Sequence, residues 1–240
     1  MIGVEICIAS DGVQPVQAAA AAALAGGASR IELCSAMHLD GLTPTAGQMK
    51  AARQAFDRPG LMVMVRPRSG DFCYSAAEVA QMDQAIATAA QAGADGVVFG
   101  LLQADGQVDQ QSVRKLVGIS HQAGLSVTFH RAFDAAADQH VALAALIECG
   151  VDRVLTSGTS WGSGAPATAG IEQLTTLLEL AEGQIELIVG GGVHRGNVAA
   201  ILQKLPLTGN RVSVHAFSGG QEDGRTTADA VARLVQAANG

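Results

Sequence analysis

The stretch Ala92-Gly-Ala-Asp-Gly-Val-Val-Phe-Gly100 joins an alanine-rich segment, Ala76–Ala92, to a short run of β-forming residues. A glycine directly after a helix can take the left-handed backbone conformation that ends the helix, and the residues beyond it then begin a strand. The same kind of junction precedes three other apolar runs, at residues 25–29, 123–126 and 149–152. This repetition predicts a chain in which helices and strands alternate.

Eight short apolar runs recur along the chain, and their first residues are 26 to 35 positions apart. That distance fits one strand, one helix and two loops. Eight such units in 240 residues predict a parallel (β/α)8 barrel, the TIM barrel, as a single domain over residues 1–240. The alternative, an open doubly wound sheet, often carries a G-x-G-x-x-G pattern after its first strand, and this pattern is missing. The runs are Val4–Ala9, Arg30–Leu33, Leu61–Arg66, Gly96–Gly100, Ser126–His130, Arg153–Thr156, Ile185–Gly190 and Arg211–His215.

The composition is that of a folded, acidic protein. Hydrophobic residues make up 48% of the chain and charged residues 15%, and the formal net charge is −7. These fractions exclude a disordered chain, and the negative charge argues against nucleic-acid binding, which needs a basic face. The first residues lack the basic start of a secretory signal, and no segment has the length and hydropathy of a membrane span. We therefore expect a cytoplasmic protein whose four cysteines, which include no C-x-x-C pair, stay reduced.

Strand residues alternate between the barrel interior and the helix layer, and the polar residues of the eight runs follow this alternation. β-branched residues and leucines share the parity that suits the helix side. The opposite parity predicts that five ionisable side chains point inward, namely Glu5, Glu32, Arg66, His130 and His215. An internal salt-bridge network, for instance of Glu5 or Glu32 with Arg66, can account for them. A functional pocket is the favoured explanation, because barrel enzymes place their sites at the carboxyl ends of the strands, where Arg66 and His130 fall.

The loop after the third run, Arg66–Ser75, is rich in groups that bind anions. Arg66 and Arg68 can each hold a carboxylate or phosphate through two parallel hydrogen bonds, and Asp71 lies in the same loop. The alternative is that the two arginines pair with Glu32 and Asp71.

The segment His130-Arg-Ala-Phe-Asp134 follows the fifth run and sets a titratable ring beside a cation and a carboxylate. We expect His130 to act as a general acid or base that Asp134 orients, with Arg131 next to the ligand.

Glycine-rich loops follow the last two long strands. Gly191 and Gly192 come after the seventh run and Ser218 after the eighth, and barrels often bind phosphate through backbone N–H groups at these two places. Ser157, after the sixth run, adds a hydroxyl group nearby. These residues extend the expected anion site.

Sulfur-containing residues also fall on the interior parity, including Cys7 and Cys34 with Met62 and Met64. Soft sulfur ligands suit Cu(I). The alternative is that these side chains are ordinary barrel core, since free cysteine and methionine pack as hydrophobic residues.

Eight segments, in order along nearly the whole chain, resemble the copper homeostasis protein CutC family. The most specific are Arg66-Pro-Arg-Ser-Gly-Asp-Phe-Cys-Tyr-Ser75 and Thr128-Phe-His-Arg-Ala-Phe-Asp134. The others are Val4-Glu-Ile-Cys7, Arg30-Ile-Glu-Leu-Cys34, Gly41-Leu-Thr-Pro44, Val154-Leu-Thr-Ser-Gly158, Gly190-Gly-Gly-Val193 and Val214-His215.

The resemblance implies a cytosolic (β/α)8 barrel, commonly a homo-oligomer, with a role in copper handling. It makes the cysteines within matching segments, Cys7, Cys34 and Cys73, the candidate copper ligands. Two residues depart from the family pattern, because Asp40 and Ser69 stand where glycine is usual. Both departures can change the shape of loops at the barrel mouth.

Two functions follow as expectations. The first is a copper-binding protein of copper homeostasis, with a polar pocket at the carboxyl-end mouth of the barrel. The second is an enzyme of isomerase or lyase type that acts on a small anionic or phosphorylated substrate. In that enzyme His130 or Glu32 is the acid or base, Asp134 orients it, and Arg66 holds the anion.

Overall fold

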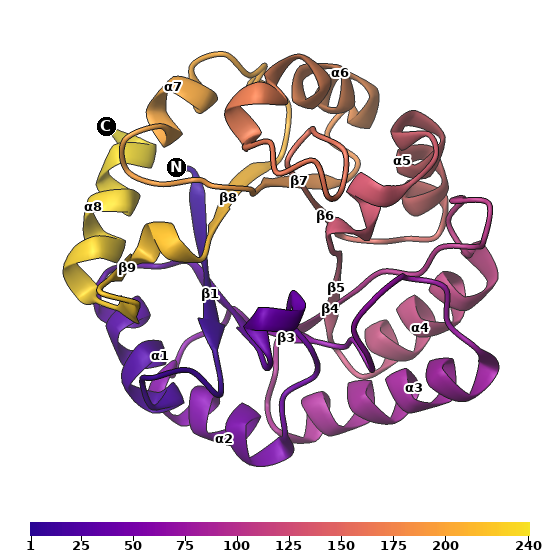
Figure 1. Ribbon diagram of the computed structural model, residues 1–240, viewed down its shortest axis with the longest axis horizontal. Helices are drawn as coiled ribbons and strands as arrows, with labels where there is room; N and C mark the ends of the chain where they lie inside the picture. Colours follow the sequence, from indigo (N-terminus) through magenta and orange to yellow (C-terminus); the bar gives the residue numbers. More distant parts are fainter.

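The computed structural model describes residues 1–240 and confirms the predicted barrel. Eight parallel strands pair in chain order, and the eighth pairs with the first to close the sheet (Figure 1). Each strand lies within two residues of the run that predicts it. The strands are β1 (Gly3–Ala9), β2 (Arg30–Cys34), β3 (Leu61–Met64), β4 (Gly96–Phe99), β5 (Ser126–Phe129), β6 (Arg153–Thr156), β7 (Glu186–Val189) and β8 (Val212–Ala216).

Eight α-helices surround the strands as an outer ring, so the chain forms one (β/α)8 TIM barrel (Figure 1). The seventh is the shortest, with five residues. The helices are α1 (Val16–Ala25), α2 (Ala46–Ala55), α3 (Ala76–Gln91), α4 (Gln110–Gln122), α5 (Gln139–Glu148), α6 (Ile171–Ala181), α7 (Val198–Leu202) and α8 (Ala228–Asn239).

The helix ends have the local causes that the sequence suggested. Gly93, Gly124 and Gly150, which follow α3, α4 and α5, have φ angles of 84°, 76° and 77°. Only glycine adopts this region without steric cost, so the glycine ends each helix and turns the chain toward the next strand. At the start of α3, Ser75 and Glu78 form a reciprocal capping box.

The alternation of strand residues is confirmed by two separate hydrophobic clusters. The larger one fills the space between strands and helices and includes Ile6, Ile8 and Leu33. The smaller one lies inside the barrel and consists of Cys7, Cys34, Met62, Met64 and Val98. The interior is therefore rich in sulfur.

The amino-terminal end of the barrel is filled by an ion-pair network centred on Arg30. Its Nε donates to Glu5 at 2.8 Å, and one Nη donates to Glu186 at 2.8 Å and to Ser213 at 2.7 Å. Arg153 adds hydrogen bonds to neighbouring hydroxyl groups. The internal network suggested by the sequence therefore exists at this end, but the partner of Glu5 is Arg30 and not Arg66.

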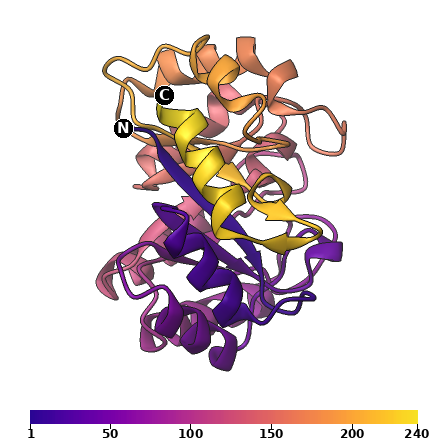
Figure 2. The ribbon, with the colours of Figure 1, turned by 90° about the vertical axis from the view of Figure 1, so that its left-hand side faces the viewer.

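Two small additions complete the fold. A hairpin, β9 (Gln221–Glu222) and β10 (Arg225–Thr226), follows β8, and short 3-10 turns occur in four loops. The chain ends lie side by side (Figure 2), because Asn239 exchanges two hydrogen bonds with the backbone of Ile2. None of the helices has the length and apolar character needed to cross a membrane.

The Arg30 network predicts a large loss of stability on substitution. In Arg30→Met the carboxylate of Glu5 stays buried without its cation, and we expect the free energy of unfolding to fall by about 3–5 kcal/mol. Urea denaturation measures the change. The matched control is Lys115→Met, which removes an exposed ion pair with Asp83 and should cost at most about 0.5 kcal/mol. Equal losses in both variants would contradict this account.

Candidate functional site

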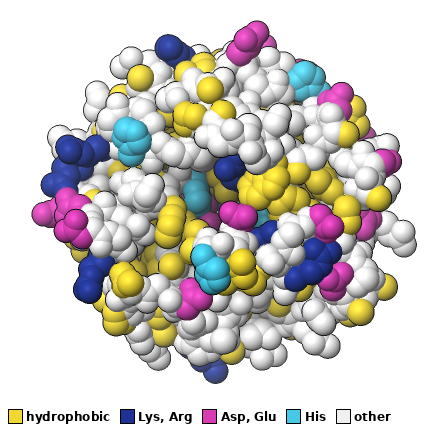
Figure 3. Space-filling model, viewed as in Figure 1, with side chains coloured by type: hydrophobic (Ala, Val, Ile, Leu, Met, Phe, Trp, Pro, Cys, Tyr) yellow, Lys and Arg dark blue, Asp and Glu magenta, His cyan; other side chains and the backbone are white.

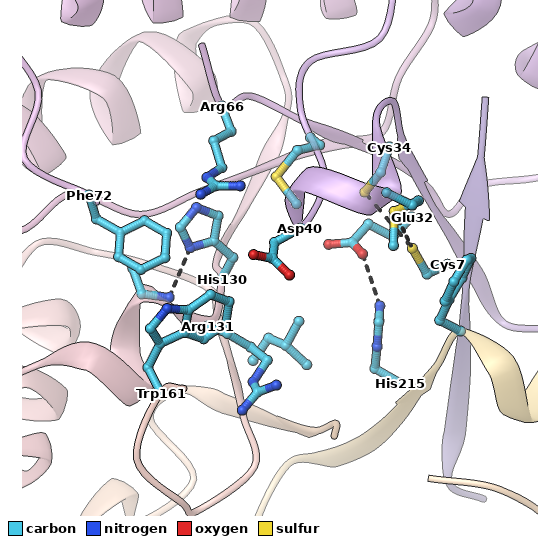
Figure 4. Close-up of a pocket in the computed structure, with 15 residues that line it drawn as sticks. Cys7, Glu32, Cys34, Asp40, Arg66, Phe72, His130, Arg131, Trp161 and His215 are labelled. Atoms are coloured by element: carbon cyan, nitrogen blue, oxygen red, sulfur yellow. Dashed lines mark hydrogen bonds and ion pairs between the residues drawn. The ribbon is translucent and has the colours of Figure 1, made fainter. Parts of the chain in front are cut away.

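A cavity of about 280 Å³ opens at the carboxyl ends of the strands. Figure 3 shows a hollow near the centre of this face, where charged and histidine side chains lie among hydrophobic ones. Strands on opposite sides of the barrel contribute to it (Figure 4). Its lining residues are Cys7, Glu32, Cys34, Met37, Asp40, Met64, Arg66, Phe72, His130, Arg131, Ala132, Leu155, Trp161, His215 and Phe217.

Three sulfur atoms gather at one side of the cavity. The Sγ of Cys7, on β1, lies 3.9 Å from the Sγ of Cys34, on β2, and 3.9 Å from the Sδ of Met37. Met37 begins a 3-10 turn, Met37–Leu39, directly after β2. Both thiols are 1% exposed. The contact with Cys7, followed by burial, raises the pKa of the Cys34 thiol well above its usual value.

Glu32 and His215 form an ion pair beside these sulfurs. The Oε2 of Glu32 lies 2.9 Å from the Nε2 of His215, which comes from β8 (Figure 4). Burial raises the pKa of Glu32 and lowers that of His215, but their mutual attraction outweighs burial in both. The pKa of Glu32 is therefore below, and that of His215 above, the usual value. The other oxygen of Glu32, Oε1, is buried without a hydrogen-bond partner.

His130 lies across the cavity from this pair, just after β5. Its Nδ1 accepts a hydrogen bond from the backbone N–H of Ala132 at 3.1 Å, while its Nε2 is buried without a partner. Burial, followed by the positive charge of Arg66, lowers the pKa of His130 to about 3. The ring packs directly against Gly100, where an added Cβ would lie 2.6 Å from two of the ring atoms. His130 is therefore a fixed, neutral imidazole.

Arg66 is 2% exposed and has no carboxylate within ion-pair distance. Its Nη atoms donate instead to three backbone carbonyls, those of Leu39 at 2.8 Å, Gly41 at 3.1 Å and Gly70 at 3.0 Å. The guanidinium carbon lies 5.2 Å from the centre of the Phe72 ring. The expected pairing of Arg66 with Glu32 does not form, and a positive charge remains beside the cavity.

Asp134 contacts Arg131 and two hydroxyl groups rather than His130. Its Oδ2 accepts from Arg131 Nε at 2.7 Å and from Ser157 Oγ at 2.9 Å, and its Oδ1 accepts from Thr156 at 2.5 Å. The expected orientation of His130 by Asp134 is therefore wrong, since a backbone N–H holds that ring. Asp134 instead fixes Arg131, whose guanidinium lies over the ring of Trp161.

Several of the expected site residues lie outside the cavity. Arg68 pairs with Glu78 and Asp71 and stacks on Tyr74, as the alternative of an Arg68–Asp71 pair foresaw. Cys73 is half-buried on the same loop and lines a separate depression.

The glycine-rich loops also lie apart from the cavity. Gly191 and Gly192 line a neighbouring depression that shares Asp40, Arg131 and Trp161 with it. Ser218 is exposed in a 3-10 turn after β8.

The two departures from the family pattern have different settings. Asp40 has a left-handed backbone with φ 64°, and its carboxylate faces the cavity from the mouth (Figure 4). Ser69 offers its carbonyl to Arg68.

Loop residues are the part of the site that the sequence analysis missed. Met37, Phe72, Trp161 and Phe217 all line the cavity, and none lies on a strand. Strand parity says nothing about loops. For Phe72 the sequence offered a signal, because it lies within the distinctive Arg66–Ser75 segment.

The low pKa of His130 predicts a loss of stability on acidification. Between its usual pKa of 6.5 and its folded pKa of about 3, the unfolded chain binds a proton at His130 and the folded chain does not. His130 therefore destabilises the folded state as the pH falls, and its own contribution is a loss of about 2 kcal/mol between pH 7 and pH 5. Glu32, with its lowered pKa, adds little slope in this range, whereas His215 opposes the fall, because its unfolded ring gains a proton that its folded ring already holds.

Urea denaturation of the wild type and of His130→Gln at both pH values isolates this contribution. We expect the fall to be smaller in His130→Gln than in the wild type by about 2 kcal/mol. If His130→Gln kept the wild-type pH dependence, the neutral state of His130 would be refuted.

Comparisons with known proteins agree with the motifs and the fold. The family model described as CutC family matches residues 2–239. A family protein CutC from Vibrio cholerae serotype O1 is 44% identical over 198 residues, 82% of this chain and 74% of that protein. One from Bacteroides thetaiotaomicron is 47% identical over 180 residues, which cover 75% of this chain and 70% of that protein.

A solved structure gives the same result. The crystal structure of the putative copper homeostasis protein CutC from Streptococcus agalactiae matches with a TM-score of 0.76 and 31% identity. The match covers 90% of this chain and 98% of that one. On the fold, the motifs and these relatives, the chain belongs to the CutC family.

Proposed function

We propose that this protein binds Cu(I) as its cargo in copper homeostasis, through the thiolates of Cys7 and Cys34 and the thioether of Met37. The observation that carries the proposal is the mutual position of the three sulfur atoms. Cys7 Sγ lies 3.9 Å from each of the other two. Thiolate and thioether sulfur are the soft ligands that Cu(I) prefers.

The spacing of the sulfur atoms fits a shared metal ion. Metal–thiolate bonds in proteins are about 2.3 Å long, so sulfurs in a plane around one ion lie about 4 Å apart. A Cβ on Gly41 would lie 3.4 Å from the Cys34 sulfur and 3.7 Å from that of Met37, so both sulfurs border the same small space. Binding of one ion by all three would therefore join sulfur atoms that are already neighbours.

The surroundings of the sulfurs also support loading with a soft cation. The raised pKa of Cys34 keeps this residue a neutral thiol without metal, so binding must release its proton. A carboxylate oxygen of Glu32 lies within 4.8 Å of both cysteine sulfurs and can relay that proton away from them. The proposal places the protein in the cytoplasm, where thiols stay reduced.

Competition with a coloured Cu(I) chelator under reducing conditions tests the proposal on the full chain. We expect the wild type to take up Cu(I) stoichiometrically, and the double variant Cys7→Ser/Cys34→Ser to lose this binding. Met37→Leu should weaken binding without abolishing it, because both thiolates remain.

The matched control is Cys73→Ser/Cys149→Ser, which removes the two cysteines outside the sulfur cluster. It should bind as the wild type does. Retention of Cu(I) by Cys7→Ser/Cys34→Ser, or its loss in the control, would rule out the assigned ligands.

A further inference from the structure

The wall of the cavity opposite Cys7, Cys34 and Met37 lies outside the proposed copper site, yet it contains buried polar groups. Two of the buried polar atoms without a partner belong to this wall, Arg66 Nε and His130 Nε2. Native proteins leave few buried polar atoms unpaired, and each such atom calls for a physical explanation. A bound ligand that accepts a hydrogen bond supplies one for His130 Nε2.

We propose that this wall, formed by His130, Arg66, Phe72 and Trp161, binds the carboxylate of a small organic acid. The carboxylate accepts a hydrogen bond from the Nε2–H of His130 and lies in the field of the Arg66 guanidinium. The apolar part of the acid packs against the two aromatic rings. This site is independent of the copper proposal.

The charge of the site is the first argument. Arg66 is a buried cation without an ion-pair partner, whereas Glu32 pairs with His215 and Arg131 with Asp134. The exposed carboxylate of Asp40, at the mouth of the cavity, forms no ion pair with Arg66. The backbone carbonyls around Arg66 provide hydrogen bonds but no opposite charge. Burying a cation without a counter-ion is costly, so an anion that enters the cavity gains this missing interaction.

The tautomer of His130 is the second argument. Nδ1 accepts a backbone hydrogen bond, so the single proton of the neutral ring must lie on Nε2. That N–H group is buried, has no acceptor and belongs to a ring that borders the cavity (Figure 4). A neutral ring with its proton on Nε2 cannot act as a base through that atom. The Nε2–H group of His130 is therefore a hydrogen-bond donor without an acceptor.

The size and lining of the cavity indicate the rest of the ligand. The cavity measures about 280 Å³ and opens to solvent at the mouth of the barrel, a size that suits a small organic acid. The Phe72 ring lies 5.1 Å from the His130 ring and 5.5 Å from that of Trp161, so an aromatic surface borders the donor. Leu155 and Phe217 add further apolar surface.

A carboxylate fits this wall better than a phosphate. One N–H donor and one guanidinium converge here, which suits the two oxygens of a carboxylate. A phosphate dianion has three terminal oxygens to satisfy and would meet two negative side chains, Asp40 at the mouth and Glu32 across the cavity. The apolar lining also favours a ligand with a hydrocarbon part.

A substitution of Asp40 tests the proposal, because it should increase the affinity for the carboxylate. Its exposed carboxylate faces the cavity and opposes an incoming anion, and its left-handed backbone is also one that asparagine tolerates (Figure 4). Asp40→Asn removes the charge and keeps the shape. We expect it to bind the carboxylate more tightly than the wild type, most clearly at low ionic strength.

The experiment titrates the full chain with isobutyrate, with isobutyramide as the neutral analogue of the same shape, and with inorganic phosphate. Nitrogen NMR of the histidine rings reports on His130 and calorimetry gives the affinity. We expect isobutyrate to bind saturably and to shift the Nε2 resonance of His130, while isobutyramide binds at least about tenfold more weakly. Binding of phosphate alone, or equal binding of acid and amide, would overturn the proposal.

Two variants disturb the donor in different ways. His130→Phe keeps a ring and removes the N–H group, whereas Gly100→Ala keeps the histidine and displaces its ring, because the new Cβ would lie 2.6 Å from it. Both should weaken isobutyrate binding at least about tenfold. The control His121→Phe changes a half-exposed histidine on α4 and should bind as the wild type does.

Thermal melts show whether each variant is folded. If one donor variant fails to fold, the other, together with Asp40→Asn, still decides the matter. Unchanged isobutyrate affinity in a folded donor variant would overturn the proposal.

Discussion

The mouth of this barrel depends on the guanidinium group of Arg66. Three carbonyl acceptors, from Leu39, Gly41 and Gly70, lie in two different loops, and one side chain from the end of β3 ties both to the barrel. The first loop carries Met37, and the second carries Phe72. A sulfur ligand on one side of the cavity and an aromatic wall on the other are thus positioned by the same cation. Because Arg66 donates its hydrogen bonds to uncharged carbonyl groups, no neighbouring anion neutralises its positive charge.

The two sides of the cavity differ in the chemistry they offer. The side built by β1, β2 and the turn after β2 presents sulfur, which favours a soft cation. The side built by the ends of β3 and β5 presents a charge and an N–H group, which favour an anion. The Glu32–His215 pair lies on the sulfur side and is neutral as a whole. Barrels commonly combine side chains from several strands at this end. Here the combination places groups that favour a cation and groups that favour an anion in one small cavity.

The sequence predicted the barrel and the inner face of its strands, because both follow from local periodicity. The glycine junctions set the alternation, and the period of two put Glu5, Glu32 and His215 inside the barrel. The sequence did not predict which charged side chains form ion pairs or hydrogen bonds with one another. Arg30 shares its parity with Glu32, yet its pairing with Glu5 and Glu186 depends on strand stagger and closure. The four-residue separation of His130 and Asp134 suggested contact, but the 3-10 turn between them directs the carboxylate toward β6.

The pairing of Glu32 with His215 has a consequence for when the site comes into being. Glu32 belongs to the second strand and His215 to the eighth, 183 residues later, and β8 also provides the second neighbour of β1. During synthesis the first strand therefore leaves the ribosome long before its partner exists, and the pocket stays open on one side. Contacts of such long sequence separation also slow folding. A truncated or still growing chain has no complete pocket. Ligand binding therefore shows that β8 has joined the barrel.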